Sequence, residues 1–170
     1  MEQVILVNER DEQVGIEEKL QAHRGGGRLH RAFSIFLFNP SGDVLLQRRA
    51  KVKYHFGGLW SNTCCGHPRP GESVTQAAGR RLDEEFGILA SLSGRTTLIY
   101  EAHDPISNLT EREFLHVLTG LFNGQPRPNR LEIDDWRWSP LDQLKNELAG
   151  ALTQFTPWLP LALAELTRLD

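Results

Sequence analysis

The sequence has few cysteines, no excess of basic residues and no long hydrophobic run. The two cysteines among its 170 residues are adjacent, Cys64 and Cys65. Neighbouring cysteines can bridge to each other only through a strained ring, so a disulfide framework is excluded. One of these thiols can be a small buried apolar group while the other is reactive.

The charge balance and the hydrophobic runs exclude two classes of partner. Lysine and arginine number 19 against 22 acidic residues, a net charge of −3, whereas a general binder of nucleic acid or anionic membranes needs a basic excess. The longest apolar run near an end, residues 158–164, contains Pro160 and is too short to span a bilayer. The first residues lack the basic and apolar regions of a secretory signal. We therefore expect a cytoplasmic protein that binds no nucleic acid and inserts into no membrane.

The composition and patterning predict one globular domain. Apolar residues make up 39% and charged residues 24%, which is typical of a folded chain, and no repeat or linker divides residues 1–170. Strands are expected at residues 4–7, 29–38, 43–49, 95–101, 111–122 and 136–138, and a turn or strand at residues 13–16. Helices are expected at residues 17–23, 73–86, 140–148 and 157–169, and a loop at residues 51–70. This order predicts an α+β or α/β sandwich with mixed β-sheets flanked by helices.

The segment from residue 66 to residue 88 carries a motif. It reads Gly66, five residues, Glu72, seven residues, then Arg-Arg-Leu-Asp-Glu-Glu-Phe-Gly-Ile. This resembles the Nudix box, GX5EX7REUXEEXGU, in which carboxylates on a helix hold divalent cations against a diphosphate. An ordinary amphipathic helix with an acidic end is the alternative, but the fixed spacing back to Glu72 and Gly66 favours the box.

One position departs from the Nudix box. Nudix hydrolases have a glutamate after the first arginine, and this chain has Arg81. A cation cannot ligate a metal or act as a general base, so we expect diphosphate hydrolysis to be impaired. Arg81 lies three and four positions before Glu84 and Glu85, on the same helical face, and can instead hold a phosphate.

Flanking residues resemble a particular family within this scaffold. Residues 60–68 read Trp-Ser-Asn-Thr-Cys-Cys-Gly-His-Pro, similar to the signature of type 1 isopentenyl-diphosphate Δ-isomerases. Further elements of that family follow the family order over residues 4–158: Lys19 with His23, Arg28-Leu29-His30, Arg48-Arg49-Ala50, Glu111-Arg112-Glu113 and Pro157-Trp158.

The resemblance implies an isomerase of isoprenoid biosynthesis with a Nudix-like sandwich. Such an enzyme interconverts isopentenyl and dimethylallyl diphosphate by a 1,3-allylic proton shift, which needs two proton-transfer groups on opposite faces of the substrate. Glu113, supported by Tyr100 and a metal, matches the family's proton donor, and Cys65 matches the opposing acid/base at C2. Cys64 occupies a variable position and is expected to pack.

The resemblance also implies two metal sites. His23, His30, His67, Glu111 and Glu113 match a site of three histidines and two glutamates, a donor set that suits Zn²⁺ or Mn²⁺. On a strand, Glu111 and Glu113 face the same side and can converge on one ion. A core or surface role is the alternative for each histidine taken alone. Mg²⁺ is expected to bridge the diphosphate and Glu85. Three histidines match no family ligand and are expected to be structural or solvated: His55, His103 and His116.

The resemblance implies that the substrate is a small prenyl diphosphate, and the remaining assignments concern its binding. The oligomeric state is left open. Diphosphate-binding cations are expected at four positions, Lys19, Arg49, Lys53 and Arg81, although solvated charges are the alternative for each. Trp60 and Trp158 match aromatics that line the prenyl pocket, where an indole face stabilises a carbocation. Trp136 and Trp138 are expected in the core.

Two other functions compete with the isomerase. A Nudix hydrolase acting on a nucleoside diphosphate derivative would need the box glutamate that Arg81 replaces, and would not need the Cys65-Gly66-His67 cluster. A catalytically inactive Nudix fold that binds a metal or ligand would not need the full set of acid, base and ligand positions.

Overall fold

The structure is a computed structural model that describes residues 2–168. The strands are β1 (Gln3–Val7), β2 (Gln13–Glu18), β3 (His30–Phe38), β4 (Val44–Arg49), β5 (Trp60–Ser61), β6 (Cys64–Gly66), β7 (Leu92–Asp104), β8 (Leu109–Leu121) and β9 (Ile133–Ser139). The helices are α1 (Lys19–Ala22), α2 (Val74–Phe86), α3 (Leu141–Gly150) and α4 (Trp158–Thr167), with a 3₁₀ turn at Leu152–Gln154. Among these described residues, no helix has the length and apolar character needed to cross a membrane.

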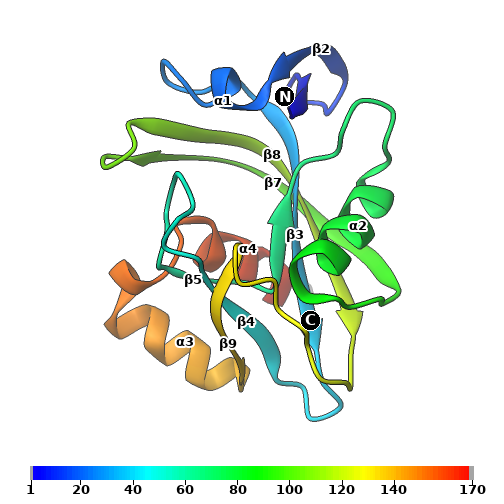
Figure 1. The fold of residues 1–170 in the computed structure, drawn as a ribbon, viewed down its shortest axis with the longest axis vertical. Helices are drawn as coiled ribbons and strands as arrows, with labels where there is room; N and C mark the ends of the chain where they lie inside the picture. Colours follow the sequence, from blue (N-terminus) through cyan, green and yellow to red (C-terminus); the bar gives the residue numbers. More distant parts are fainter. Residues whose placement is uncertain (1, 169–170) are drawn as a thin grey trace.

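Strand β3 is the centre of the sheet (Figure 1). Along its length it pairs in parallel with β8, from His30 opposite Glu113 to Phe38 opposite Leu121. It also pairs antiparallel with the short β6, where Ser34 lies opposite Cys65. Strand β8 forms a long antiparallel hairpin with β7, β4 pairs with β9 and β5, and the β1–β2 hairpin joins β3 at its start.

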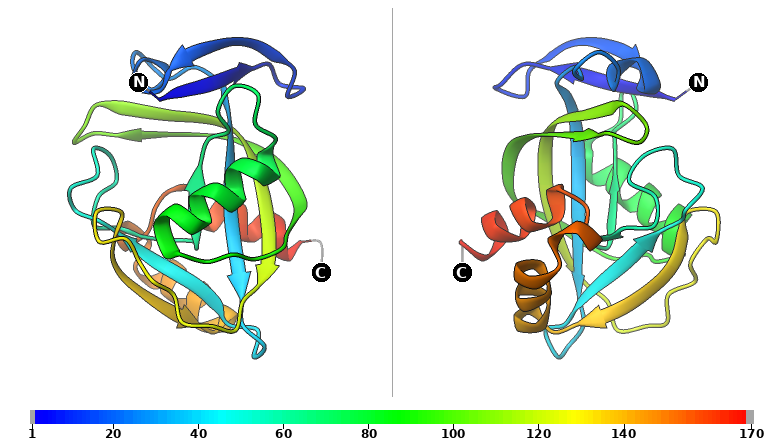
Figure 2. Two further views of the ribbon diagram at one scale, coloured as in Figure 1. Left: turned by 45° about the vertical axis from the view of Figure 1, so that its right-hand side comes forward. Right: turned by 90° about the vertical axis from the view of Figure 1, so that its left-hand side faces the viewer.

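Helices cover both faces of this sheet (Figure 2). Alternate residues of β3 point to opposite sides: Phe33 and Ile35 pack in the cluster that contains α2 residues, while Ala32 and Phe36 pack with α4. The predicted sandwich of mixed β-structure flanked by helices is therefore confirmed.

Helix α2 forms where the sequence predicts it. The Ser73 side chain accepts a hydrogen bond from the Gln76 backbone, and the Gln76 side chain accepts one from the Ser73 backbone, which makes a capping box. The helix ends at Gly87, which adopts the left-handed conformation with φ of 61°. Its buried apolar residues are Ala77, Ala78, Leu82 and Phe86.

Three local predictions are wrong in their extent. The helix predicted at residues 17–23 is reduced to α1, because Glu17 and Glu18 pair with Val4 and Gln3 in the β1–β2 hairpin. The predicted loop at residues 51–70 contains β5 and β6, and strands 95–101 and 111–122 extend into a hairpin that turns between Asp104 and Leu109. The last helix covers Trp158–Thr167; residue 169 of its predicted range lies outside the described residues.

Candidate active site

One cavity brings together residues from five parts of the chain: the amino-terminal hairpin with α1, strand β3, the 51–58 loop with the end of β4, the β6–α2 region, and the β7–β8 hairpin with α4. It is lined by Glu2, Lys19, Ser34, Arg49, Lys53, Tyr54, His55, Cys65, Gly66, His67, Arg81, Tyr100, Glu111, Glu113 and Trp158. Polar and charged side chains dominate this lining, and most of them can transfer a proton, bind a metal ion or bind an anion.

The two-residue period of the strands places these groups on one side of the sheet. Glu111 and Glu113 on β8 are followed on the same face by Leu115 and Val117, which belong to the α4-side core. His30 begins β3 directly opposite Glu113 in the parallel register. One sheet face is therefore apolar over most of its length and carboxylate- and histidine-rich at one end.

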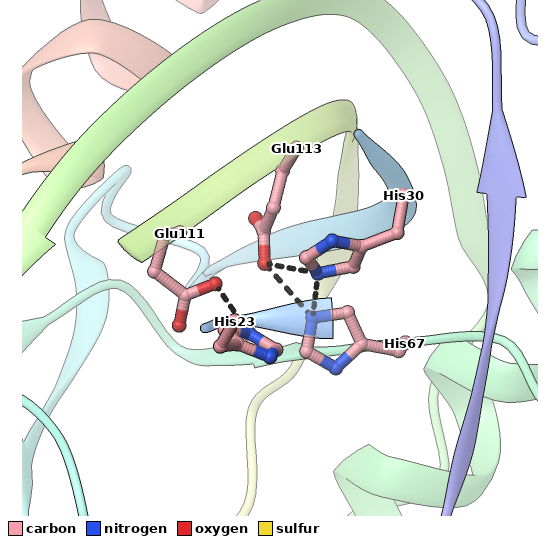
Figure 3. Close-up of side chains that lie close together, drawn as sticks. All are labelled: His23, His30, His67, Glu111 and Glu113. Carbon is pink, nitrogen blue, oxygen red and sulfur yellow. Dashed lines mark hydrogen bonds and ion pairs between the residues drawn. The ribbon is translucent and has the colours of Figure 1, made fainter. Parts of the chain in front are cut away.

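At that end, five side chains converge (Figure 3). One potential ligand atom from each lies within 4.8 Å of all the others, and all five residues are buried. They come from the C-cap of α1, the start of β3, the residue after β6, and β8: His23, His30, His67, Glu111 and Glu113. The structure thus brings together all five residues that the sequence resemblance implies for the histidine site.

The hydrogen bonds of two histidines aim their Nε2 atoms at this point. The Nδ1 atom of His23 lies 2.6 Å from the Lys19 carbonyl, and that of His30 lies 2.7 Å from the Arg28 carbonyl. A carbonyl only accepts, so each Nδ1 carries the proton and donates it. In the neutral rings, each Nε2 is then a free lone pair directed into the cluster.

These lone pairs face other acceptors. His30 Nε2 lies 3.2 Å from His67 Nε2, and His23 Nε2 lies 2.9 Å from Glu111 Oε2. Such contacts require a proton or a cation between the paired atoms. Three imidazoles with two carboxylates are a donor set that fits a divalent ion such as Mn²⁺ or Zn²⁺.

The pKa values of the two glutamates move in opposite directions. Burial opposes ionisation of Glu111, but hydrogen bonds from His55 and from the protonated form of His23 outweigh it and hold the pKa of this carboxyl well below its usual value. Burial and then the negative charge of Glu111 raise the pKa of Glu113. Two neighbouring carboxyl groups with separated pKa values are an arrangement suited to acid/base chemistry.

Tyr100 is placed against Glu113. The two residues are paired across the β7–β8 ladder, and the Tyr100 hydroxyl donates a hydrogen bond of 2.7 Å to Glu113 Oε2. Burial, followed by the charge of Glu113, raises the pKa of Tyr100 well above its usual value. The hydroxyl therefore keeps its proton at neutral pH and is a hydrogen-bond donor to the carboxyl group.

Cys65 faces the same cavity from β6. Its sulfur lies 3.2 Å from Ser34 Oγ and donates to Asn62 Oδ1, also at 3.2 Å. The Asn62 amide is fixed because its nitrogen donates to the Ile35 and Cys64 carbonyls. Burial raises the pKa of Cys65 to about 11. Cys64 points to the other side of the sheet and packs in the α2-side core.

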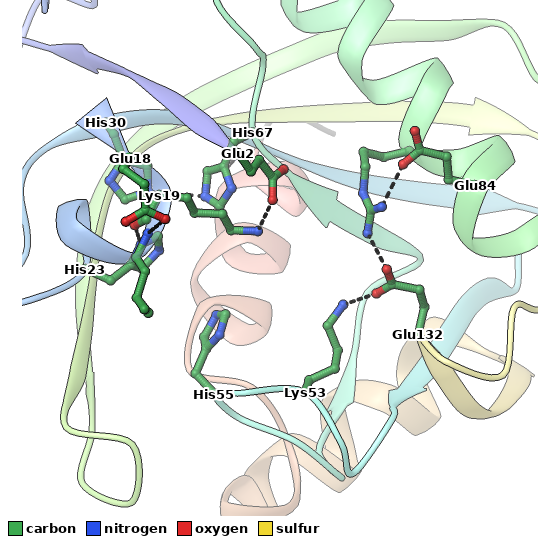
Figure 4. Close-up of polar contacts among 12 residues, drawn as sticks. Glu2, Glu18, Lys19, His23, His30, Lys53, His55, His67, Glu84 and Glu132 are labelled. Carbon is green, nitrogen blue, oxygen red and sulfur yellow. Dashed lines mark hydrogen bonds and ion pairs between the residues drawn. The ribbon is translucent and has the colours of Figure 1, made fainter. Parts of the chain in front are cut away.

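The four predicted diphosphate-binding cations all line this cavity. Lys19 pairs with Glu2 at 3.0 Å, and the Arg49 guanidinium lies 5.4 Å from the Trp158 ring centroid. Glu132 lies between the other two, in contact with Lys53 and 3.4 Å from Arg81 (Figure 4).

The Nudix-box carboxylates have separate tasks. Glu72 forms two 2.8 Å hydrogen bonds with Arg80 and so ties the loop to α2. Glu85 is buried, contacts Arg81 and accepts a 2.8 Å hydrogen bond from Gln47. Glu85 is not part of the five-residue cluster and lies beside the cations that face the cavity, with Lys53 Nζ 4.0 Å from Glu85 Oε1. Glu85 thus supplies a hard carboxylate oxygen of the kind that Mg²⁺ prefers, beside Glu132, which contacts the same cations.

The tryptophan assignments differ from the structure at Trp60. Trp60 is not among the residues that line the cavity; its ring lies between the guanidinium groups of Arg48 and Arg137, at 5.8 and 4.7 Å. The reason is that Arg48 pairs with Trp60 across β4 and β5. Trp136 and Trp138 pack against the α2-side core, as expected.

His55 was expected to be structural or solvated, and the structure shows that it is not solvated. It is buried, lines the cavity and contacts Glu111. It lies in a segment without periodicity, and its position two residues after Lys53 was the only signal in the sequence. His116 and His103 instead pair with Asp11 and Thr110.

Comparison with known proteins first defines the class. Residues 28–159, most of the chain, match the NUDIX domain family. A Deinococcus radiodurans protein, DR0079, superposes with a TM-score of 0.78 at 24% identity, covering 96% of this chain and 98% of that one. A MutT protein from Methanosarcina mazei superposes with a TM-score of 0.67 at 18% identity, over 82% and 94%. The protein has the Nudix fold.

Sequence relatives then define the family. The isopentenyl-diphosphate Δ-isomerase of Halorhodospira halophila is 50% identical over 159 residues, which are 93% of this chain and 91% of the relative. Isopentenyl-diphosphate Δ-isomerase 1 of Aromatoleum aromaticum is 48% identical over 93% and 88%. The chain belongs to the isopentenyl-diphosphate Δ-isomerase family.

Proposed function

We propose that this protein interconverts isopentenyl diphosphate and dimethylallyl diphosphate, and that Cys65 and Glu113 transfer the protons. The observation that carries the proposal is their common cavity: they stand on strands that flank β3 on either side, and both side chains line the same space. A substrate between them meets one proton-transfer group on each side.

The reaction balances with these two groups alone. A proton adds to the terminal methylene of isopentenyl diphosphate, and the π electrons form the new C–H bond, leaving a tertiary cation. The C2–H bond then breaks, its electrons form the new double bond, and the proton passes to a base. Protonated Glu113 with a Cys65 thiolate serves this direction, and a Glu113 carboxylate with a Cys65 thiol serves the reverse.

The environment of Glu113 suits the acid. An alkene is a weak base, so its protonation needs a well-placed acid in a site that excludes water. Glu113 is 6% exposed, and its raised pKa favours the protonated form more than in a free glutamate. Tyr100 fixes the carboxyl group through the 2.7 Å hydrogen bond.

The five-residue cluster fits a resident metal ion. His23, His30, His67, Glu111 and Glu113 would hold it, as Mn²⁺ or Zn²⁺. When bound, the ion supplies positive charge that offsets the two buried carboxylates and increases the acidity of a proton on Glu113. The histidines keep that carboxyl group oriented toward the cavity.

The diphosphate end of the substrate would meet the cations that line the cavity. Lys19, Arg49, Lys53 and Arg81 would contact its oxygens, with Glu85 as the protein carboxylate for Mg²⁺. Trp158, 3% exposed, presents its ring beside Arg49. An indole face stabilises a desolvated cation by about 2 kcal/mol. The ring would therefore stabilise the tertiary cation, which has no counter-ion beside it.

The proposal places residues 1–170 in one catalytic domain that acts on a small molecule, with no nucleic acid and no membrane insertion. It also places the protein in the cytoplasm, where reducing conditions keep Cys65 a free thiol. Cys64 and Cys65 are both free in the structure.

Incubation with isopentenyl diphosphate and Mg²⁺ in D₂O tests the activity. The expected product is dimethylallyl diphosphate that carries deuterium at the exchanged carbons. Release of phosphate would instead identify a Nudix hydrolase, and neither product nor exchange would identify a binding module. Either of these outcomes would overturn the proposal.

A further inference from the structure

The geometry points to His55 as a positioning residue that orients Glu111 for the metal ion, a role outside the five-residue cluster. This inference rests on the proposed metal site. His55 touches none of the reacting groups in the mechanism above, and acts through Glu111.

The two oxygens of Glu111 have different partners. Oε2 lies 2.9 Å from His23 Nε2, inside the cluster. Oε1 is in contact with His55 Nε2 on the other side of the carboxylate. His55 itself lies outside the group of five whose ligand atoms converge. One oxygen is therefore available to an ion, and His55 holds the other.

The direction of the hydrogen bond follows from the acceptor. A carboxylate oxygen only accepts hydrogen bonds, so in this contact His55 Nε2 carries the proton that it donates. Donation to the oxygen that does not face the ion fixes the rotation of the carboxylate, as neighbouring hydrogen-bond partners of metal ligands commonly do.

The loop around His55 holds the imidazole in place (Figure 4). The Arg49 guanidinium donates a 3.1 Å hydrogen bond to the His55 carbonyl. The ring packs against Tyr54, with centroids 4.4 Å apart, and edge-on against Phe56 at 5.6 Å. Phe56 has a positive φ of 48° and is anchored by its backbone nitrogen, which donates to Asp104 at 3.1 Å. An imidazole restrained from so many sides is a rigid donor.

Loss of His55 leaves a buried acceptor without a partner. Glu111 is 3% exposed, so water cannot easily replace the imidazole, and an unsatisfied carboxylate oxygen is costly. The carboxylate is expected to rotate away from the cluster, and the affinity for the ion to fall. Substitution of such supporting partners typically weakens metal binding by about 10- to 100-fold.

The experiment measures Mn²⁺ binding to the metal-free full chain by the electron paramagnetic resonance signal of free Mn²⁺, without substrate. His55→Ala is expected to raise the Kd by about 10- to 100-fold while keeping one ion per chain. His55→Gln retains a donor and is expected to recover most of the affinity. His116→Ala is the matched control for His55→Ala, because it removes a 3.0 Å histidine–carboxylate pair outside the cavity, with Asp11.

A further pair of variants separates positioning from ligation. His23→Ala removes a donor of the cluster itself and is expected to abolish the stoichiometric site. Combining His55→Ala with Glu111→Gln is expected to weaken binding little beyond Glu111→Gln alone, because His55 acts through that carboxylate.

Three results would overturn the inference: an unchanged Kd for His55→Ala, a complete loss of the site equal to that of His23→Ala, or equal weakening by His116→Ala. If His55→Ala fails to fold, the inference is tested with His55→Gln instead. This variant is expected to bind Mn²⁺ more tightly than Glu111→Gln, and equal or weaker binding would overturn the inference. Because no substrate is present, a wild-type protein that binds Mn²⁺ but lacks isomerase activity would refute the proposed reaction and leave this inference standing.

Discussion

Cys65 and Glu113 lie on opposite sides of strand β3 and line one cavity. Cys65 is opposite Ser34 in the antiparallel β3–β6 pairing, and Glu113 is opposite His30 in the parallel β3–β8 pairing. Both pairings place the side chains on the face of β3 that Ala32 shares. Two sheet ladders therefore fix the separation of the proton-transfer groups, and no flexible loop determines it.

Replacement of the sulfur tests the Cys65 side of this pair. Cys65→Ser keeps hydrogen bonds to Ser34 and Asn62 in reach, but a hydroxyl is far less acidic than a thiol. We expect kcat with isopentenyl diphosphate to fall by roughly 100- to 10,000-fold with an unchanged circular dichroism spectrum. Cys64→Ala is the control: it lies in the opposite core and should retain activity. Full activity of Cys65→Ser would remove Cys65 from the mechanism.

Removal of one hydroxyl tests the support of Glu113. Tyr100→Phe loses the 2.7 Å hydrogen bond to Oε2 and keeps the ring, whose centroid lies 6.3 Å from that of Trp158. A hydrogen bond to a charged group is worth about 1.5–3 kcal/mol, so kcat is expected to drop about tenfold or more. KM should change little, because the diphosphate cations are untouched. A lower substrate affinity with an unchanged kcat would contradict this role.

Metal content tests the histidine site. Glu111→Gln replaces a carboxylate by a neutral amide, which is a weaker ligand for a divalent ion. After dialysis against Mn²⁺, the variant is expected to retain clearly less than one ion per chain by elemental analysis. Glu101→Gln is a suitable control, since Glu101 lies on the same hairpin but its side chain is 61% exposed. Equal metal content in Glu111→Gln and wild type would exclude Glu111 as a ligand.

Local patterns were enough to predict α2 and the strand character of β3. The helix has apolar residues at helical spacing and a glycine at its end, and both signals are independent of the rest of the chain. The prediction for residues 17–23 failed because Glu17 and Glu18 are recruited by β1. The local conformational preferences of these two residues give no information about that long-range pairing.

The candidate site was predictable where a motif carried it. Spacing around Cys65, Gly66 and His67, together with the glutamate pair on β8, identified residues that the structure brings to one cavity. His55 and Trp60 were not predictable in this way. The contact between His55 and Glu111 depends on how the 51–58 loop closes over β8, and Trp60 is turned toward Arg137 by the β4–β5 pairing.

Two glycines in the Nudix motif should respond oppositely to alanine. A Cβ at Gly66 would lie 2.9 Å from Phe33 Cζ and 3.2 Å from Arg81 Cγ, whereas a Cβ at Gly79 on α2 meets nothing within 4 Å. Gly66→Ala is expected to lower the free energy of unfolding by about 1–3 kcal/mol. Gly79→Ala should raise it by about 0.5–1 kcal/mol through helix propensity. Urea denaturation measures both, and equal effects would contradict the close packing at Gly66.

The protonation state of Cys65 can be measured by alkylation of the metal-free protein. Burial raises the pKa of this thiol to about 11, and only the thiolate reacts with iodoacetamide. A raised pKa means that the proton is lost only at high pH, so the rate constant at pH 7 should be roughly 300-fold below that of a free cysteine with a pKa of about 8.5.

The same rate constant should rise about tenfold for each pH unit until it approaches pH 11, in step with the thiolate fraction. Cys65→Ser supplies the background, because Cys64 is fully buried and burial raises its pKa well above the usual value as well. A rate that levels off near pH 8 would show that the thiol ionises in the physiological range. The Cys65 thiolate would then be the resting form, and isopentenyl diphosphate, not dimethylallyl diphosphate, would be the substrate for which the free enzyme is poised.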